Sequence, residues 1–274
     1  MPEGDTVHLA AARLRTALGG RVLTAAELRV PRHATARLAG RRVVDVAARG
    51  KHLLVRLDGG LTLHTHFEMD GSWHLYRPGR RWRGPEHEVR AVLATDEWVA
   101  VGFRLAATDL LPSAREAELV GHLGPDLLGD DGVPVAAGGW DAAEAVRRLA
   151  AAPERAVGDA LLDQRNLAGV GNVYKSELCF LRGLDPWTPM GDVPDVAGLV
   201  ALARRLLWAN RTTGSQVTTG DPVSGRSRWV YGRAGLPCRR CGTPVRRAPA
   251  RAGSERVTYW CPSCQPRPAP RSSA

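Results

Sequence analysis

Residues 42–64, RVVDVAARGKHLLVRLDGGLTLH, decide the fold of the first half of the chain. Short runs rich in valine and leucine are separated here by Arg49-Gly50 and by Asp58-Gly59-Gly60. Glycine-containing turns between such runs predict antiparallel hairpins. A second pair of strands is expected at residues 88–93 and 99–103. Many short strands at this spacing indicate an antiparallel β-sandwich or barrel.

Helical patterns flank this β region. Before it, Asp5 followed by apolar residues at helical spacing predicts a helix capped by Asp5 and stopped at Gly19-Gly20. After it, residues 111–140 break into turns rich in proline, glycine and aspartate, which indicates a linker. Further helices are expected at residues 141–151, from Pro153 to Leu162, at 173–181 and at about 196–211. The chain is therefore predicted to be an α+β protein.

Residues 163–172, DQRNLAGVGN, form a predicted loop directly before the helix at 173–181. A glycine-containing loop that opens a helix presents backbone N–H groups and the positive end of the helix dipole, so it can bind a phosphate. A tight turn between two helices is the alternative interpretation of the same residues.

Two cysteine pairs stand near the end of the chain. Cys238 and Cys241 are two residues apart, and so are Cys261 and Cys264. Two thiolate pairs at this spacing predict one structural zinc ion with four sulfur ligands. The fifth cysteine, Cys179, lies in an apolar helix and is expected to be buried.

The net charge of +10 is concentrated in residues 201–274, where fourteen arginines and two acids give +12. A basic region indicates a polyanionic partner, most often nucleic acid, although a solvated arginine-rich surface is the alternative. Only Lys51 and Lys175 of the 38 basic residues are lysines, which marks both as candidates for contacting phosphate or moving a proton. The sequence shows neither a signal-peptide pattern nor an apolar run of the ~20 residues that span a membrane, so a cytoplasmic protein is expected.

The first residues, Met1-Pro2-Glu3, offer a nucleophile. Removal of Met1 would expose the secondary amine of Pro2, and an α-amino group has a pKa of about 7.7–8.0, so it can form a Schiff base at neutral pH. Glu3 could carry the proton that such chemistry moves. A solvated N-terminus without catalytic function is the alternative interpretation.

Four motifs together resemble the formamidopyrimidine-DNA glycosylase / endonuclease VIII family, in the family's order and over nearly the whole chain. They are Met1-Pro2-Glu3-Gly4, Arg49 to Leu54, Asp163 to Asn172, and the cysteine element from Arg256 to Gln265.

This resemblance implies a bifunctional DNA glycosylase and abasic-site lyase of base excision repair. Pro2 would attack the sugar C1′ of a damaged nucleotide and form a Schiff base, and Glu3 would transfer protons. Successive β- and δ-elimination would then cut the strand. Lys51 matches the lysine that contacts the phosphate of the damaged nucleotide, and a surface lysine on a strand is the alternative.

The resemblance also implies three DNA contacts. Asn172 and Arg256 match residues that bind phosphates beside the lesion, and Met69 matches the residue that fills the gap left by the everted base. The alternatives are a solvated Arg256 and a core methionine at position 69. Lys175 matches no residue of known role.

Departures from the family pattern bear on the substrate. The purine-lesion branch carries an Asp-Pro-Arg-Arg-Phe-Gly run where residues 95–100 here read TDEWVA. This favours the endonuclease VIII branch and oxidised pyrimidines, with a purine-lesion glycosylase or an inactive zinc-ribbon DNA-binding protein as alternatives. Thr6 replaces a glutamate common to both branches, so Asp5 is assigned no role.

The expected organisation has four parts. A catalytic β-sandwich domain covers 1–125, a helix–two-turn–helix domain with a mobile loop at 212–228 covers 126–228, a zinc ribbon covers 229–266, and a disordered tail covers 267–274. The expected partner is double-stranded DNA with damaged bases or abasic sites, bound by a monomer at the nucleoid and without membrane contact.

Overall fold

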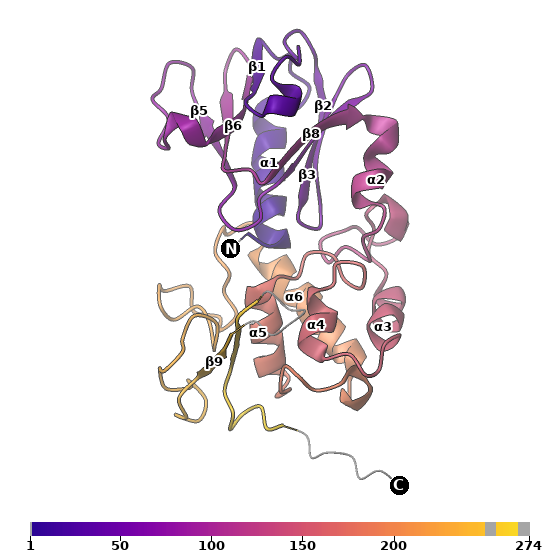
Figure 1. Cartoon of the computed structure of the whole chain (residues 1–274), viewed down its shortest axis with the longest axis vertical. Coiled ribbons are helices and arrows are strands. Elements are labelled where there is room, and N and C mark those ends of the chain that lie inside the picture. Colours follow the sequence, from indigo (N-terminus) through magenta and orange to yellow (C-terminus); the bar gives the residue numbers. More distant parts are fainter. Residues whose placement is uncertain (1, 250–255, 268–274) are drawn as a thin grey trace. The chain divides into compact units, whose positions relative to one another are not determined.

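The computed structural model describes residues 2–249 and 256–267, which form two compact units, Met1–His122 (unit 1) and Leu123–Ala274 (unit 2) (Figure 1). The disordered tail was expected at 267–274, and all of it except Arg267 lies outside the described residues. Every helix in the described part of the chain is too short or too polar to cross a membrane.

Unit 1 contains two antiparallel four-stranded sheets, as the turn pattern predicted. One has the order β2-β3-β4-β8 and contains β2 (Val43–Arg49), β3 (His52–Leu57), β4 (Leu61–His66) and β8 (Ala107–Pro112). The other has the order β1-β6-β7-β5 and contains β1 (Ala25–Leu28), β5 (Ser72–Tyr76), β6 (Val89–Ala94) and β7 (Val99–Phe103). Strands β1, β5 and β8 were not predicted from the sequence.

Glycine geometry fixes the hairpins that join β2, β3 and β4. Gly50 has φ 56° and Gly59 and Gly60 have φ 69°, a region that side chains with a Cβ avoid. With these turns the register is set, since Arg49 pairs with His52 and Leu57 with Leu61. Side chains from both sheets, including Val46, Leu63 and Leu93, meet in one buried core.

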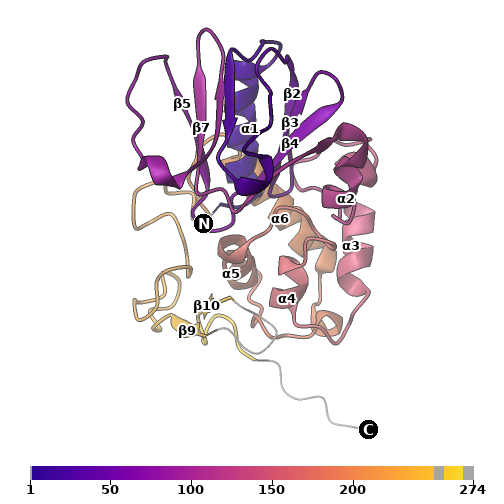
Figure 2. The ribbon, with the colours of Figure 1, turned by 45° about the horizontal axis from the view of Figure 1, so that its top comes forward.

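Helix α1 (Gly4–Leu18) contacts β2 and β3 of one sheet and β5 of the other (Figure 2). Its N-cap is Glu3 and not Asp5, so that prediction is wrong. Glu3 has the extended backbone of a cap residue, with φ −124° and ψ −172°, whereas Asp5 lies buried in the first turn. The Asp5 carboxylate accepts a hydrogen bond from the Thr6 N–H at 2.7 Å.

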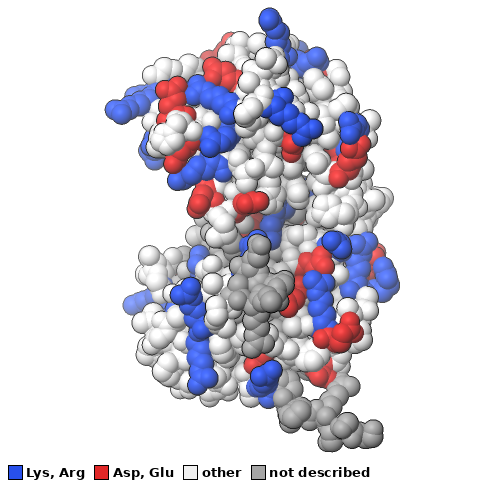
Figure 3. All heavy atoms as spheres, viewed as in Figure 1, with Lys and Arg blue, Asp and Glu red and all other residues white. Residues whose placement is uncertain are grey.

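Many charged side chains on the surface of unit 1 form ion pairs. Figure 3 shows basic and acidic side chains side by side on the drawn face of this unit. Arg56 joins strand β3 to the short helix α2 (Glu116–Val120) through an ion pair with Glu116 at 2.8 Å.

Short 3-10 turns lie at Pro31–His33, Glu86–Glu88 and Ser113–Arg115, and in unit 2 at Val135–Ala137 and Met190–Asp192.

Unit 2 is built on α3 (Ala142–Ala150), α4 (Val157–Leu162), α5 (Asn172–Leu181) and α6 (Val196–Asn210), which share one apolar core. Pro153 does not open α4, contrary to expectation. The backbone from Pro153 to Val157 bonds instead to residues 188–191, with Val157 N–H on the Thr188 carbonyl at 2.8 Å. These backbone hydrogen bonds to residues 188–191 keep the segment from joining the helix.

The cysteine-containing end of unit 2 carries a two-stranded antiparallel sheet of β9 (Arg246–Ala248) and β10 (Thr258–Trp260). Helix α5 holds the segment that precedes this sheet, residues 229–231, through the fully buried Glu177. The Glu177 carboxylate accepts the backbone N–H groups of Trp229, Val230 and Tyr231 at 2.8 to 2.9 Å, and also the Thr218 hydroxyl. The expected loop at 212–228 is thus anchored at Thr218.

Replacing Glu177 with alanine should destabilise this part of unit 2 by about 3 kcal/mol, because three backbone N–H groups, which are buried or partly buried, lose their acceptor. Hydrogen exchange of the Trp229–Tyr231 amides, followed by mass spectrometry, measures the loss. Glu154→Gln, a change at an exposed carboxylate, is the matched control. Unchanged exchange in the Glu177 variant would contradict the anchoring role.

Candidate functional site

Pro2 and Glu3 lie at the start of α1. Glu3 is 0% exposed, and Pro2 before it is partly exposed. The end of α1 is fixed at the start of β2, since the Gly20 N–H bonds the Val43 carbonyl and Arg15 bonds Asp45. Helix and strand are each roughly 22 Å long, so α1 begins near the other end of β2, where the turn to Lys51 lies. Two motifs far apart in sequence thus approach each other.

Lys51 occupies the tight turn between β2 and β3, after Gly50. Both flanking strands are paired up to the turn, with Arg49 opposite His52. The turn therefore holds Lys51 in a defined place on a rigid sheet, which a group that contacts substrate requires.

A histidine chain that the sequence did not reveal begins beside Lys51. The His52 Nδ1 and His64 Nε2 atoms are 2.9 Å apart, and His64 Nδ1 lies 3.1 Å from Asp109 Oδ2. Because a carboxylate only accepts, His64 donates from Nδ1 and its Nε2 accepts from His52. Burial lowers the pKa of His52 to about 3 and also lowers the pKa of His64. Both histidines are therefore neutral at pH 7. Their hydrogen bonds join the start of β3 to β4 and β8.

Met69 is 56% exposed in the turn after β4. This excludes the alternative of a core methionine. Glu68 beside it has φ 47°, and its N–H donates to His66 Nδ1 at 3.2 Å. The turn presents Met69 as an apolar side chain toward solvent.

The loop at 163–171 is organised by Gln164. Its amide nitrogen donates to the carbonyls of Leu162 and Val170 at 2.8 and 2.9 Å, and its oxygen accepts the Gly169 N–H at 3.0 Å. Gly169 has φ 109°, which only glycine adopts readily. The loop is thus preformed, and Gly171 is the N-cap of α5.

Unit 2 places Asn172 beside the backbone that follows Arg256, although 84 positions separate the two residues. The buried Asn172 donates from Nδ2 to the Val257 carbonyl at 2.8 Å, directly after the exposed Arg256. The first turn of α5 therefore sets the backbone position of Arg256.

Lys175 makes a second link between α5 and β10. It is only 2% exposed, and its Nζ donates to Thr258 Oγ1 at 2.8 Å. Lys175 is therefore not a solvated lysine on the surface of its helix. Periodicity placed it on a helix but gave no sign of a partner 83 residues away.

The four cysteines expected to bind metal form one cluster, with all Sγ atoms within 4.8 Å of one another. Cys238 and Cys264 are 3.9 Å apart, and Cys241 and Cys261 are 3.5 Å apart. Hydrogen bonds from Thr243 lower the pKa of Cys241 to about 6, while burial raises the pKa of Cys264. The cluster could hold one metal ion.

Cys179 lies outside this cluster and is fully buried in the helical core, as predicted. Burial raises the pKa of its thiol to about 12. It has the character of an apolar core residue.

Comparisons with known proteins place the chain in a family. The family model described as formamidopyrimidine-DNA glycosylase N-terminal domain matches residues 1–110. The chain is 57% identical to a protein of Streptomyces coelicolor named probable endonuclease 8 2, over 99% of this chain and 96% of that protein. It is 47% identical to a protein of Mycolicibacterium smegmatis named DNA-(apurinic or apyrimidinic site) lyase Nei2, over 97% of this chain and 99% of that one.

A solved structure of Lactococcus lactis Fpg, in complex with DNA that contains an abasic site, has the same fold. Its TM-score is 0.77 at 19% identity, covering 97% of this chain and all of that one. The α+β fold predicted from the sequence is confirmed. The chain belongs to the formamidopyrimidine-DNA glycosylase / endonuclease VIII family, on its endonuclease VIII-like branch.

Proposed function

We propose that this protein is a bifunctional DNA glycosylase and abasic-site lyase that removes oxidised pyrimidines from double-stranded DNA. The observation that carries the proposal is the 47% identity, over nearly the whole of both chains, to a relative whose name denotes an abasic-site lyase. The buried Glu3 after Pro2 and the rigid Lys51 turn support it.

In the proposed reaction, Met1 is removed and the Pro2 nitrogen forms a bond to C1′ as the bond from C1′ to the base breaks. Glu3 transfers the protons that accompany departure of the base and opening of the sugar ring, which leaves a Schiff base. Loss of a C2′ proton then expels the 3′ phosphate, and a later proton loss expels the 5′ phosphate. Lys51 neutralises the phosphate of the damaged nucleotide and assists these transfers.

We assign Asn172 and Arg256 to the phosphates beside the lesion. The Asn172 amide has two N–H groups, of which one bonds Val257, so the other can reach a phosphate oxygen. Arg256 is exposed at the neighbouring position and offers a fork of donors. The two side chains together form the proposed phosphate-binding site of unit 2.

Arg256→Ala should weaken binding of every damaged duplex by about tenfold without altering their rank, because a phosphate contact carries no base information. Fluorescence anisotropy at two salt concentrations measures the affinity. The slope of log affinity against log salt concentration should become smaller by about 1, because one phosphate contact is lost. Arg247→Ala, which removes another exposed arginine near the cysteine cluster, should have a smaller effect. A changed rank would mean that Arg256 contacts the base.

Met69 is proposed to fill the gap left by the everted nucleotide. Eversion costs a few kcal/mol of unstacking and unpairing, and an inserted apolar side chain offsets part of it. Met69→Ala should slow base removal by about tenfold, yet scarcely slow the cutting of a preformed abasic site, which has no base to unstack. Single-turnover rates on a duplex with a damaged base and on a duplex with a preformed abasic site measure the difference. Equal slowing on both would contradict the proposal that Met69 fills the gap.

We propose that Cys238, Cys241, Cys261 and Cys264 hold one zinc ion. Sulfur ligands at 2.3 Å in a tetrahedron are about 3.8 Å apart, and the separations of 3.5 and 3.9 Å lie on either side of that value. When bound, the ion cross-links two turns and stabilises the fold. We further propose the division into 1–125, 126–228 and 229–266, a monomer, and a cytoplasmic location at the nucleoid.

The substrate is tested by incubating the protein with duplexes that contain thymine glycol, 8-oxoguanine or an abasic site, and separating the products on a denaturing gel. We expect cutting at thymine glycol and at the abasic site, with 8-oxoguanine cut at least about tenfold more slowly. Preferred cutting at 8-oxoguanine would favour a purine-lesion glycosylase. Tight binding without cutting would favour a DNA-binding protein that has lost catalysis.

A further inference from the structure

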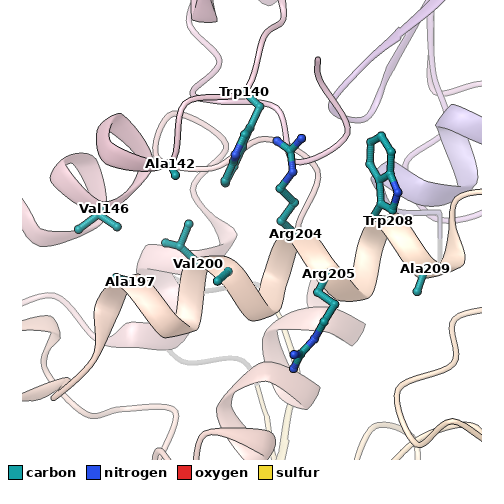
Figure 4. A pocket seen from close by; sticks show the side chains of 10 residues that line it. Trp140, Ala142, Val146, Ala197, Val200, Arg204, Arg205, Trp208 and Ala209 are labelled. Atoms are coloured by element: carbon teal, nitrogen blue, oxygen red, sulfur yellow. The ribbon is translucent and has the colours of Figure 1, made fainter. Parts of the chain in front are cut away.

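A pocket in unit 2 plays no part in the proposed reaction. It lies between the segment around α3 and the exposed side of α6, and it encloses about 560 Å³ (Figure 4). Trp140 and Val146 line one side, and Val200, Arg204 and Trp208 line the other, with alanines between them. A volume of this size holds one or two large side chains.

Arg204 is held between two indole rings. Its guanidinium carbon lies 4.6 Å from the centre of the Trp140 ring and 5.6 Å from that of Trp208, and Figure 4 shows the group between them. Arg211 also stacks on Trp208, at 4.1 Å. Stacking fixes these side chains before any partner arrives, which lowers the entropy cost of binding. Although both arginines stack on it, Trp208 is still 39% exposed, so part of its ring is accessible to a partner.

The charge of Arg204 is weakly satisfied. Its Nη2 lies 3.2 Å from Asp131, whose side chain is 80% exposed, and an exposed pair of this kind stabilises by only about 0–1 kcal/mol. Within the described residues, its buried Nη1 has no hydrogen-bond partner. Arg205 adds a second cation to the pocket lining. A carboxylate of a partner can therefore replace Asp131 at little cost.

We propose that this pocket is a docking site for a protein segment that carries large apolar side chains beside carboxylates. The apolar walls require an apolar side chain, and the two arginines require an acid, so the partner's chemistry follows from the lining. Tryptophan and arginine are also the residues that most often dominate protein interfaces. Double-stranded DNA would satisfy the arginines but would leave the apolar space between Val146 and Val200 unfilled.

The probe is the peptide Asp-Asp-Leu-Phe-Asp-Asp-amide with fluorescein joined to its N-terminal amine, titrated with the full-length protein in 0.15 M salt. Two matched peptides replace either the aspartates with asparagine or the Leu-Phe pair with serine. We expect the acidic apolar peptide to bind at least about tenfold more tightly than either, since each half of the site is used. Equal binding of the asparagine peptide, or no binding of any peptide, would overturn the proposal.

Variants locate the site. Arg204→Gln and Ala201→Glu should each weaken peptide binding by about tenfold, and Ala201 is an exposed helix position where glutamate keeps the fold. Arg80→Gln, an equal loss of charge in unit 1, should change binding by less than about twofold. An equal loss in the Arg80 variant would indicate diffuse attraction to a basic protein. Displacement of the peptide by a single-stranded oligothymidine, with the same loss in the Arg204 variant, would identify a nucleic-acid surface and contradict the proposal.

Because none of these variants alters a residue of the proposed reaction, cutting of an abasic duplex should be unchanged in all of them. Failure of the docking proposal would therefore leave the lyase proposal standing, and the reverse also holds.

Discussion

Replacing Pro2 with glycine should lower the rate of base removal by about 1,000-fold while binding to an uncleavable abasic analogue stays nearly unchanged. The variant still loses Met1 and still has an N-terminal amine, but this amine is primary and lacks the ring that fixes the direction of its lone pair. Single-turnover excision of thymine glycol measures the effect.

A second variant tests whether the position of the N-terminal amine matters for the reaction. Pro2→Leu should retain Met1, because a large second residue prevents its removal, and the amine then lies one residue, or roughly 3.5 Å, from its place. Excision should become undetectable, since reacting atoms must approach within about 3–3.5 Å. Full activity in this variant would mean that another group is the nucleophile.

Replacing Cys261 with serine should abolish metal binding and release the ordered structure around the cluster. The apolar core there is small, consisting of Phe180, Val230, Val245 and two of the cysteines. A structural zinc ion contributes an apparent 10–16 kcal/mol in small domains, so a core of this size cannot replace it. Since Arg256 lies close to the cluster in sequence, DNA binding should fall by about 100-fold or more.

Cys179→Ala is the matched control, because it removes a buried cysteine that is not part of the cluster. It should cost about 1–3 kcal/mol of stability through the small cavity it leaves, yet keep the metal and the DNA affinity. Native mass spectrometry should find one zinc ion in the wild type and in Cys179→Ala, and none in Cys261→Ser. An ordered, metal-free wild type would contradict the zinc proposal.

Features set by neighbours in sequence were predictable. The hairpins around Gly50 and Gly59 follow from the turn residues, whose positive φ values then fix the strand register. The cysteine cluster follows from two short spacings, and α5 from its apolar run.

Features set by distant contacts were not predictable. Glu177 and Lys175 look like charged positions on an apolar helix, and only the fold brings Trp229 and Thr258 to them. The cap of α1 was misplaced because aspartate is a common N-cap, whereas here Asp5 is turned inward. Pro153 was expected to open a helix, but backbone bonds to residues 188–191 hold it elsewhere.

Borohydride trapping tests the central claim most directly. The protein is incubated with a thymine-glycol duplex and sodium borohydride, and the cross-linked product is digested and mapped by mass spectrometry. We predict a covalent adduct on the N-terminal peptide, at Pro2, with Met1 absent. No adduct, or an adduct on Lys51 or Lys175, would contradict the mechanism.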